Sequence, residues 1–233
     1  MEPKVRWVTT TFFGLLVLPA SAGLSISLYD FLIGVHSDAL SLRELTFFLS
    51  GFGLWILVFV FLNRPVRLYI LGHELTHLLV AWASGIRGGE MEIGSDGGSV
   101  RVERSTFWIA IAPYVIPLYS LLVILGFGFL PSQADSVLVQ RLFPILLGLT
   151  WSFHITFTLY AVCQPQSDFH SYGLLGSLSI ILLLNLLLLT FLAAMLHSDP
   201  FTEEVSHAWE RVQGCYAWTW TQLLLIKNTI IQG

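Results

Sequence analysis

The stretch from Tyr172 to Leu196 is mostly apolar and contains no charged side chain. A helix needs about 20 mostly apolar residues to cross a membrane, so this stretch predicts a membrane span. The same reasoning predicts six spans, at Trp7 to Tyr29, Thr46 to Leu62, Val66 to Ser84, Thr106 to Leu130, Val137 to Cys163 and Tyr172 to Leu196. Charged residues make up 11% of the chain, against roughly a quarter in soluble domains. We therefore expect an all-α, integral, multi-pass membrane protein.

The spans are expected to form one transmembrane domain over residues 1–199. We find no internal repeat or linker, and the longest polar interval, Gly85 to Ser105, is too short to fold alone. The first span contains Ala20-Ser21-Ala22-Gly23 after a basic start, which resembles a cleavable signal sequence. Apolar residues continue to Leu32, which favours an uncleaved span.

Residues 200–233 predict a C-terminal amphipathic helix outside this domain. Pro200 followed by Glu203 and Glu204 suits a helix start, because prolines and acidic residues are favoured in the first turn. Aromatic and aliphatic residues then recur every three or four positions, as in a helix that lies in the membrane interface. A helix that simply packs on the bundle is the alternative.

The charge pattern and the cysteines limit the partners and metal sites that we expect. The net charge of −4 is spread thinly along the chain, so nucleic acid is not an expected partner, whereas the lipid bilayer is. Cys163 and Cys215 form no CxxC motif, so they predict neither a disulfide framework nor a thiolate metal site.

The third predicted span contains the motif His73-Glu74-Leu75-Thr76-His77. On a helix, residues four apart share a face, so both imidazoles can bind one ion. In HExxH sites the ion is Zn²⁺, held by two histidines and a third protein ligand, and the glutamate accepts a proton from the attacking water. Glu74 is therefore the candidate catalytic residue for hydrolysis. The alternative is a buried polar cluster that hydrogen-bonds neighbouring helices without a metal.

Few polar residues can supply the third ligand: His154, Asp168, His170 and, less plausibly, Asn185. We favour Asp168, because Pro165 ends the fifth span just before it and lets the chain turn back toward the bundle. His154 lies earlier in that span, at a different depth. It remains the alternative ligand, or a hydrogen-bond donor beside the site. Asp168 could equally be a solvated loop acid, and His154 or Asn185 could join helices.

The region from Tyr69 to Gly173 resembles the site-2 protease class of intramembrane zinc metallopeptidases, in particular its smaller members without a PDZ domain. Gly72 to His77 corresponds to the metal-binding helix, and Gly88 to Ile93 with Gly97 to Val102 corresponds to the β-hairpin that follows it. The resemblance implies a membrane-protein or peptide substrate. The family signature NPxxDG is absent, and Gln164 to Asp168 is its nearest counterpart.

The hairpin is also indicated by the residues themselves. Val100 and Val102 alternate with polar neighbours and follow glycines, as in an exposed strand that can pair with an unwound peptide. The candidate substrate-presenting residues are Gly98, Ser99 and Val100, and an ordinary surface loop is the alternative. Pro113 and Pro117 predict a kink in the next span.

Membrane orientation is left open by two opposing indications. The distribution of Lys and Arg mildly favours an N-terminus inside, whereas the family places the hairpin and the aspartate toward the cytosol. In either orientation six spans keep the hairpin loop and the Gln164 to Ser171 loop on one face. The expected location is the plasma membrane of a bacterium.

These features predict a zinc endopeptidase that cleaves transmembrane or membrane-proximal peptides. Two alternatives have different chemistry: an inactive pseudoprotease that binds partner helices, and a zinc hydrolase that acts on lipid. The intact Glu74 argues against the pseudoprotease, while the lipid hydrolase would use the same ligands.

Overall fold

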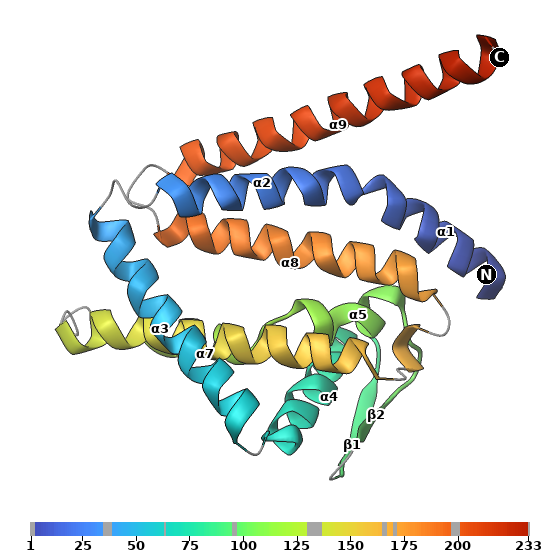
Figure 1. The fold of residues 1–233 in the computed structure, drawn as a ribbon. Coiled ribbons are helices and arrows are strands. Elements are labelled where there is room, and N and C mark those ends of the chain that lie inside the picture. The colour runs from blue at the N-terminus through green and yellow to red at the C-terminus, as the bar shows by residue number, and fades with distance from the viewer. Residues whose placement is uncertain are drawn as a thin grey trace. The chain divides into compact units, whose positions relative to one another are not determined.

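The computed structural model describes residues 3–34, 39–62, 64–94, 97–129, 137–164, 167–169, 172–196 and 201–232. These residues form nine α-helices, one two-stranded sheet and a short 3-10 turn (Figure 1). In chain order they are α1 Pro3–Leu16, α2 Leu18–Gly34, α3 Ala39–Phe61, α4 Val66–Ala83, β1 Gly88–Ile93, β2 Gly98–Val102, α5 Phe107–Val115, α6 Leu118–Gly128, α7 Val137–Val162, the 3-10 turn η2 Ser167–Phe169, α8 Leu174–Leu196 and α9 Phe201–Gln232.

Four stretches of the described chain are helical, long and apolar enough to cross a membrane: Lys4–Gly34, Leu42–Phe61, Gln140–Val162 and Leu174–Met195. The bent pair α5 and α6 gives a fifth if it is counted as one span. A mostly helical fold with several helices suited to crossing a membrane is thus confirmed, but the prediction of six spans is not. Most of the predicted span Val66 to Ser84 does form a helix, α4, yet it is outside this group, because its motif residues make it more polar.

The described chain divides into two compact units, residues 1–42 with 171–233, and residues 43–170. In the first unit, glycines bring helix backbones together. Gly14 packs on Gly176 between α1 and α8, and Gly23 packs on the backbone of Val212 between α2 and α9. Small residues allow this close approach in membrane helices.

Helix α9 confirms that the C-terminal segment is helical, and it belongs to the same compact unit as α1, α2 and α8. Arg211 pairs with Asp30 of α2 at 2.7 Å, and the Tyr216 hydroxyl donates to the Leu16 carbonyl at 2.9 Å. Trp220 is 64% exposed. The placement of α9 in the membrane interface stays a prediction.

The second unit holds α3 from Arg43 onward, α4, the hairpin, α5, α6, α7 and η2. Helices α3 and α7 approach closely at Gly51 and Gly148, each of which packs against backbone of the other helix. Beside them Trp55, Phe153 and Phe157 form a buried aromatic cluster. This packing holds α7 firmly, and η2, which carries Asp168, follows α7 in the chain.

A break between α5 and α6 turns the chain by 68°. Pro113 lies inside α5 and Pro117 caps the start of α6, so the predicted kink is confirmed. Proline lacks an N–H and cannot continue the helical hydrogen-bond pattern.

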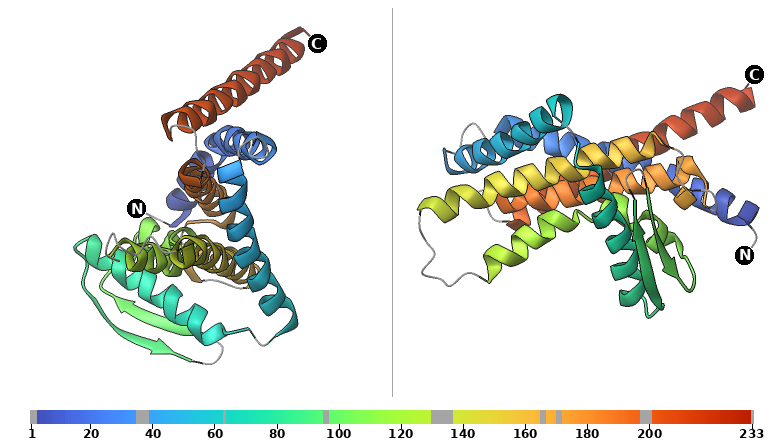
Figure 2. Two further views of the ribbon diagram at one scale, coloured as in Figure 1. Left: turned by 90° about the vertical axis from the view of Figure 1, so that its left-hand side faces the viewer. Right: turned by 90° about the horizontal axis from the view of Figure 1, so that it is seen from below.

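The predicted hairpin is confirmed, with β1 and β2 antiparallel and Met91 opposite Val100. Both strands lie along α4, as Figures 1 and 2 show. Ala81 of α4, Ile86, Ile109 and the partly buried Val102 form an apolar cluster at the base of the hairpin. The hairpin is therefore anchored on the helix that carries the HExxH motif.

Candidate metal centre

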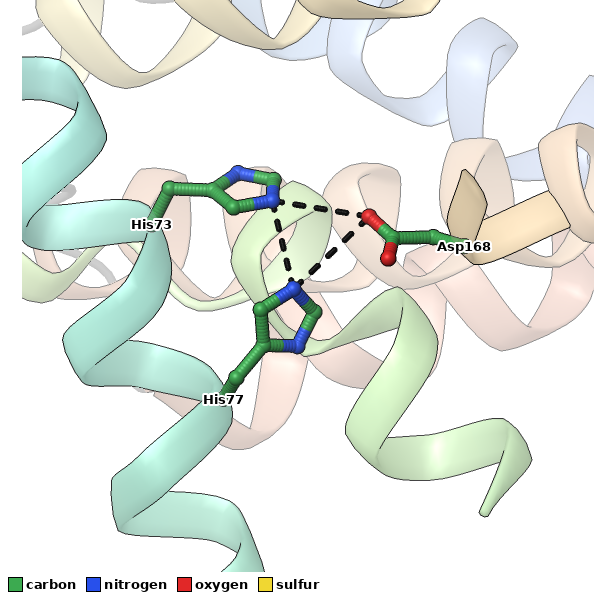
Figure 3. Close-up of side chains that lie close together, drawn as sticks. All are labelled: His73, His77 and Asp168. Atoms are coloured by element: carbon green, nitrogen blue, oxygen red, sulfur yellow. Dashed lines mark hydrogen bonds and ion pairs between the residues drawn. The ribbon is translucent and has the colours of Figure 1, made fainter. Parts of the chain in front are cut away.

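Three side chains, two from α4 and one from η2, converge on one point (Figure 3). His73 and His77 project from successive turns of α4, and their Nε2 atoms are 3.2 Å apart. Asp168 projects from η2, with Oδ2 3.5 Å from His73 Nε2 and 3.7 Å from His77 Nε2. Both histidines are buried. The structure thus brings together the three residues that the sequence predicts as metal ligands.

The three distances, 3.2, 3.5 and 3.7 Å, lie close to the separations expected between ligand atoms around one metal ion. Ligand atoms at about 2.0–2.2 Å from a tetrahedral zinc lie roughly 3.3–3.6 Å from one another. The separations of 3.5 and 3.7 Å between imidazole nitrogens and the Asp168 carboxylate are longer than an N–H···O hydrogen bond, which peaks at about 2.9–3.0 Å. His73, His77 and Asp168 could therefore hold a metal ion, and two imidazoles with a carboxylate are a donor set that suits zinc.

Hydrogen bonds on the far side of each imidazole orient both rings. His77 Nδ1 lies 2.7 Å from the Ile109 carbonyl. Because a carbonyl only accepts, Nδ1 carries the proton, and the Nε2 lone pair of the neutral ring faces the cluster. His73 Nδ1 lies 3.0 Å from the Tyr69 hydroxyl, which can play the same part. Partners of this kind are usual for metal-bound histidines.

Asp168 is held by Tyr114, whose hydroxyl donates to Oδ2 at 2.8 Å. Tyr114 is 1% exposed, and its ring meets that of His73 edge-on. Burial disfavours the charged form of this carboxyl, whereas the hydrogen bond from Tyr114 favours it. The carboxylate is the form of Asp168 that binds metals.

Glu74 lies next to the cluster and is buried. Among the residues that the structure describes, its carboxylate has no hydrogen-bond partner. Gly98 at the start of β2 lies directly against it, since a Cβ atom added to Gly98 would come within 3.0 Å of Glu74 Cγ and 2.5 Å of Ile70 Cγ2. A strand backbone therefore passes beside the candidate catalytic carboxylate.

The remaining candidates lie elsewhere. His154 is buried on α7 and lines a cavity beside His73, but it is not one of the three converging residues. Asn185 lies on α8 in the other compact unit, where its amide donates to the Ile181 carbonyl. His170 falls outside the described residues.

Sequence reasoning missed the two tyrosines that support the site. Tyr69 stands four residues before His73, so helical spacing alone placed it on the same face. Tyr114 carries no such signal, because it reaches Asp168 from a different helix across 54 positions of sequence.

Comparison of the chain with protein-family models, with curated proteins and with solved structures gave no match. The likeness to site-2 proteases thus stays a prediction from the motifs.

Proposed function

We propose that the protein is an intramembrane zinc metalloendopeptidase that hydrolyses peptide bonds of transmembrane or membrane-proximal substrates. The observation that carries the proposal is the convergence of His73, His77 and Asp168 on one point, with Glu74 next to His73 on the same helix. A carboxylate beside a candidate metal site can accept the proton of a metal-activated water.

Each residue has a role in this proposal. His73, His77 and Asp168 would hold the zinc ion, which when bound supplies a Lewis acid and a water of lowered pKa. Glu74 accepts the proton of the attacking water and returns it to the nitrogen of the leaving amine. Tyr114 and the Ile109 carbonyl keep Asp168 and His77 in place through the bonds described above.

The hairpin suits a substrate that has lost its helical structure. A transmembrane helix buries its carbonyls in internal hydrogen bonds, so a bond in it can be hydrolysed only after local unwinding. Gly98, Ser99 and Val100 belong to β2, at the start of which Gly98 adjoins Glu74. In the proposal this strand supplies replacement backbone hydrogen bonds to the unwound segment, as in β-augmentation. The proposal also takes the membrane to be a bacterial plasma membrane.

The decisive variant is Glu74→Gln, which keeps the size of the side chain and removes its basicity. We would purify the full chain, place it in lipid vesicles with a panel of single-span peptides, and measure fragments by mass spectrometry and zinc by elemental analysis. We expect zinc content to be unchanged and cleavage to fall by about 10²–10⁴-fold, the usual contribution of a general base.

Glu103→Gln is the matched control, because Glu103 is an exposed glutamate of the same unit. It should cleave like the wild type. Equal cleavage by Glu74→Gln and Glu103→Gln would refute the proposal. Release of fatty acid from vesicle lipid by the wild type but not by Glu74→Gln would indicate a lipid hydrolase instead, and bound zinc without any product would indicate a pseudoprotease.

A further inference from the structure

A small cavity lies beside His73, within the unit formed by residues 43–170. It is bordered by α4, by the break between α5 and α6, and by α7, it opens on one side, and its volume is about 30 Å³. Its lining includes Gly72 and Thr76 from α4, Ile116 and Leu118 from the break, and Phe153 and Thr158 from α7. His73 belongs both to this lining and to the metal-ligand cluster, so the cavity adjoins the site where a scissile bond would lie.

The walls of this cavity, which we call the His73 pocket, are fixed by close packing. A Cβ atom on Gly72 would lie 2.8 Å from Tyr119 Cε2, so the tyrosine ring packs flush on the α4 backbone. The Tyr119 hydroxyl donates to the Leu68 carbonyl at 2.6 Å, and the Tyr119 ring also meets Phe153 edge-on at 5.1 Å. Because these contacts fix both the ring and the hydroxyl of Tyr119, moving the side chain to admit a larger group costs free energy.

Three of the hydroxyl groups around the pocket are already bonded to the protein. Tyr69 bonds His73, Thr76 donates to the Gly72 carbonyl at 2.7 Å, and Tyr119 donates to Leu68. A trapped water needs two to four polar partners, and these bonds reduce what the lining can offer. The pocket is thus better suited to a small side chain than to a held water molecule.

Size and position together identify the occupant. A volume near 30 Å³ accommodates roughly one or two groups the size of a water molecule, which matches a methyl or hydroxymethyl side chain. The two Cα atoms that flank a peptide bond lie only about 1.5 Å from its carbon and nitrogen, so a side chain next to the scissile bond reaches a pocket that touches a metal ligand.

We propose that the His73 pocket is a specificity pocket, which accepts the side chain of one residue flanking the scissile bond and restricts it to alanine, serine or glycine. This inference rests on the proposed peptidase function and adds the substrate class to it. Of the three residues, glycine also favours local unwinding of a helix, whereas alanine does not.

The test uses the full-length protein in lipid vesicles with single-span peptides of one host sequence. After the cleaved bond has been mapped, the residue on each side is varied in turn among Gly, Ala, Ser, Val, Leu and Phe. At one of the two positions we expect kcat/KM to fall at least about tenfold from Ala to Leu, since each methylene that a pocket cannot fit costs roughly 10-fold or more.

Two variants enlarge the pocket without touching the cluster: Leu118→Ala and Ile116→Ala, both at half-buried positions. Either should raise cleavage of the Val and Leu peptides relative to the Ala peptide by about tenfold. The matched control is Leu125→Ala, another leucine of α6 that does not line the pocket, and it should leave the selectivity unchanged.

The outcomes separate the two proposals. Cleavage that depends on Glu74 but is equally fast for Ala and Leu at both positions would refute the specificity pocket alone. Selectivity that stays the same in both enlarged variants would also refute it. Absence of any Glu74-dependent cleavage across the whole panel would refute the peptidase function and, with it, the pocket.

Discussion

The hydroxyl of Tyr114 offers the sharpest test of the candidate metal centre. It donates to Asp168 Oδ2 at 2.8 Å and is buried, and Oδ2 is the same oxygen that faces both histidines. Tyr114→Phe removes this one hydrogen bond and keeps the ring that packs on His73. The carboxylate should then lose its fixed orientation while the apolar packing remains.

The expected magnitude follows from the kind of bond that is lost. A hydrogen bond to a charged group contributes about 1.5–3 kcal/mol, and loss of a partner that orients a metal ligand typically weakens metal binding about 10–100-fold. The two ranges agree, since a tenfold change in Kd corresponds to about 1.4 kcal/mol and a 100-fold change to about 2.8 kcal/mol. We therefore expect the zinc Kd of Tyr114→Phe to rise by one to two orders of magnitude.

The assay is competition between the purified protein and a chromophoric chelator for zinc. Tyr119→Phe is the matched control: it loses a hydroxyl from the same unit, but that hydroxyl bonds the Leu68 backbone rather than the cluster. It should leave the zinc Kd unchanged. If Tyr114→Phe binds zinc as tightly as the wild type while Asp168→Ala does not, the orienting role of Tyr114 is wrong.

Two further predictions concern the ligands and the hairpin. Zinc measured by elemental analysis should be lost from Asp168→Ala and retained by His154→Ala, and loss from the His154 variant alone would overturn the choice of Asp168. Gly98→Ala should slow peptide cleavage about tenfold with zinc unchanged, because overpacking costs about 1–3 kcal/mol and the new methyl would crowd Ile70 and Glu74. Gly89→Ala in β1, where a Cβ meets nothing within 4 Å, is its control, and equal rates for the two variants would contradict the proposed closeness of strand and site.

Features encoded by short stretches of sequence could be predicted. The spacing of His73 and His77 on one helix determines that their rings meet, and the structure has them 3.2 Å apart. Apolar and polar residues alternate around Val100 after glycines, and this pattern predicted the hairpin. Pro117 predicted the break between α5 and α6. Each of these depends on backbone geometry over a few residues, which local sequence controls.

Features that depend on packing between elements could not be predicted. The predicted span at α4 is not confirmed, because the same polar residues that form the site lower the apolar character by which spans are recognised. The approach of Asp168 to α4 could be favoured from Pro165 but not separated from the alternatives, and the contribution of Tyr114, which requires α5 to lie beside η2, was missed. No periodicity in the sequence encodes such meetings.

The hydrogen bonds of the cluster bear on the alternative that it is only a buried polar cluster that joins helices without a metal. In such a metal-free cluster, the donors and acceptors of the three side chains should hydrogen-bond one another. Here His77 Nδ1 and Asp168 Oδ2 are bonded to Ile109 and Tyr114, and the two Nε2 atoms lie 3.2 Å apart, within hydrogen-bond distance. The Asp168 carboxylate is 3.5 and 3.7 Å from the two imidazoles, too far for hydrogen bonds. The carboxylate therefore does not hydrogen-bond the histidines, and the three atoms lie close to the spacing of ligands around a metal ion.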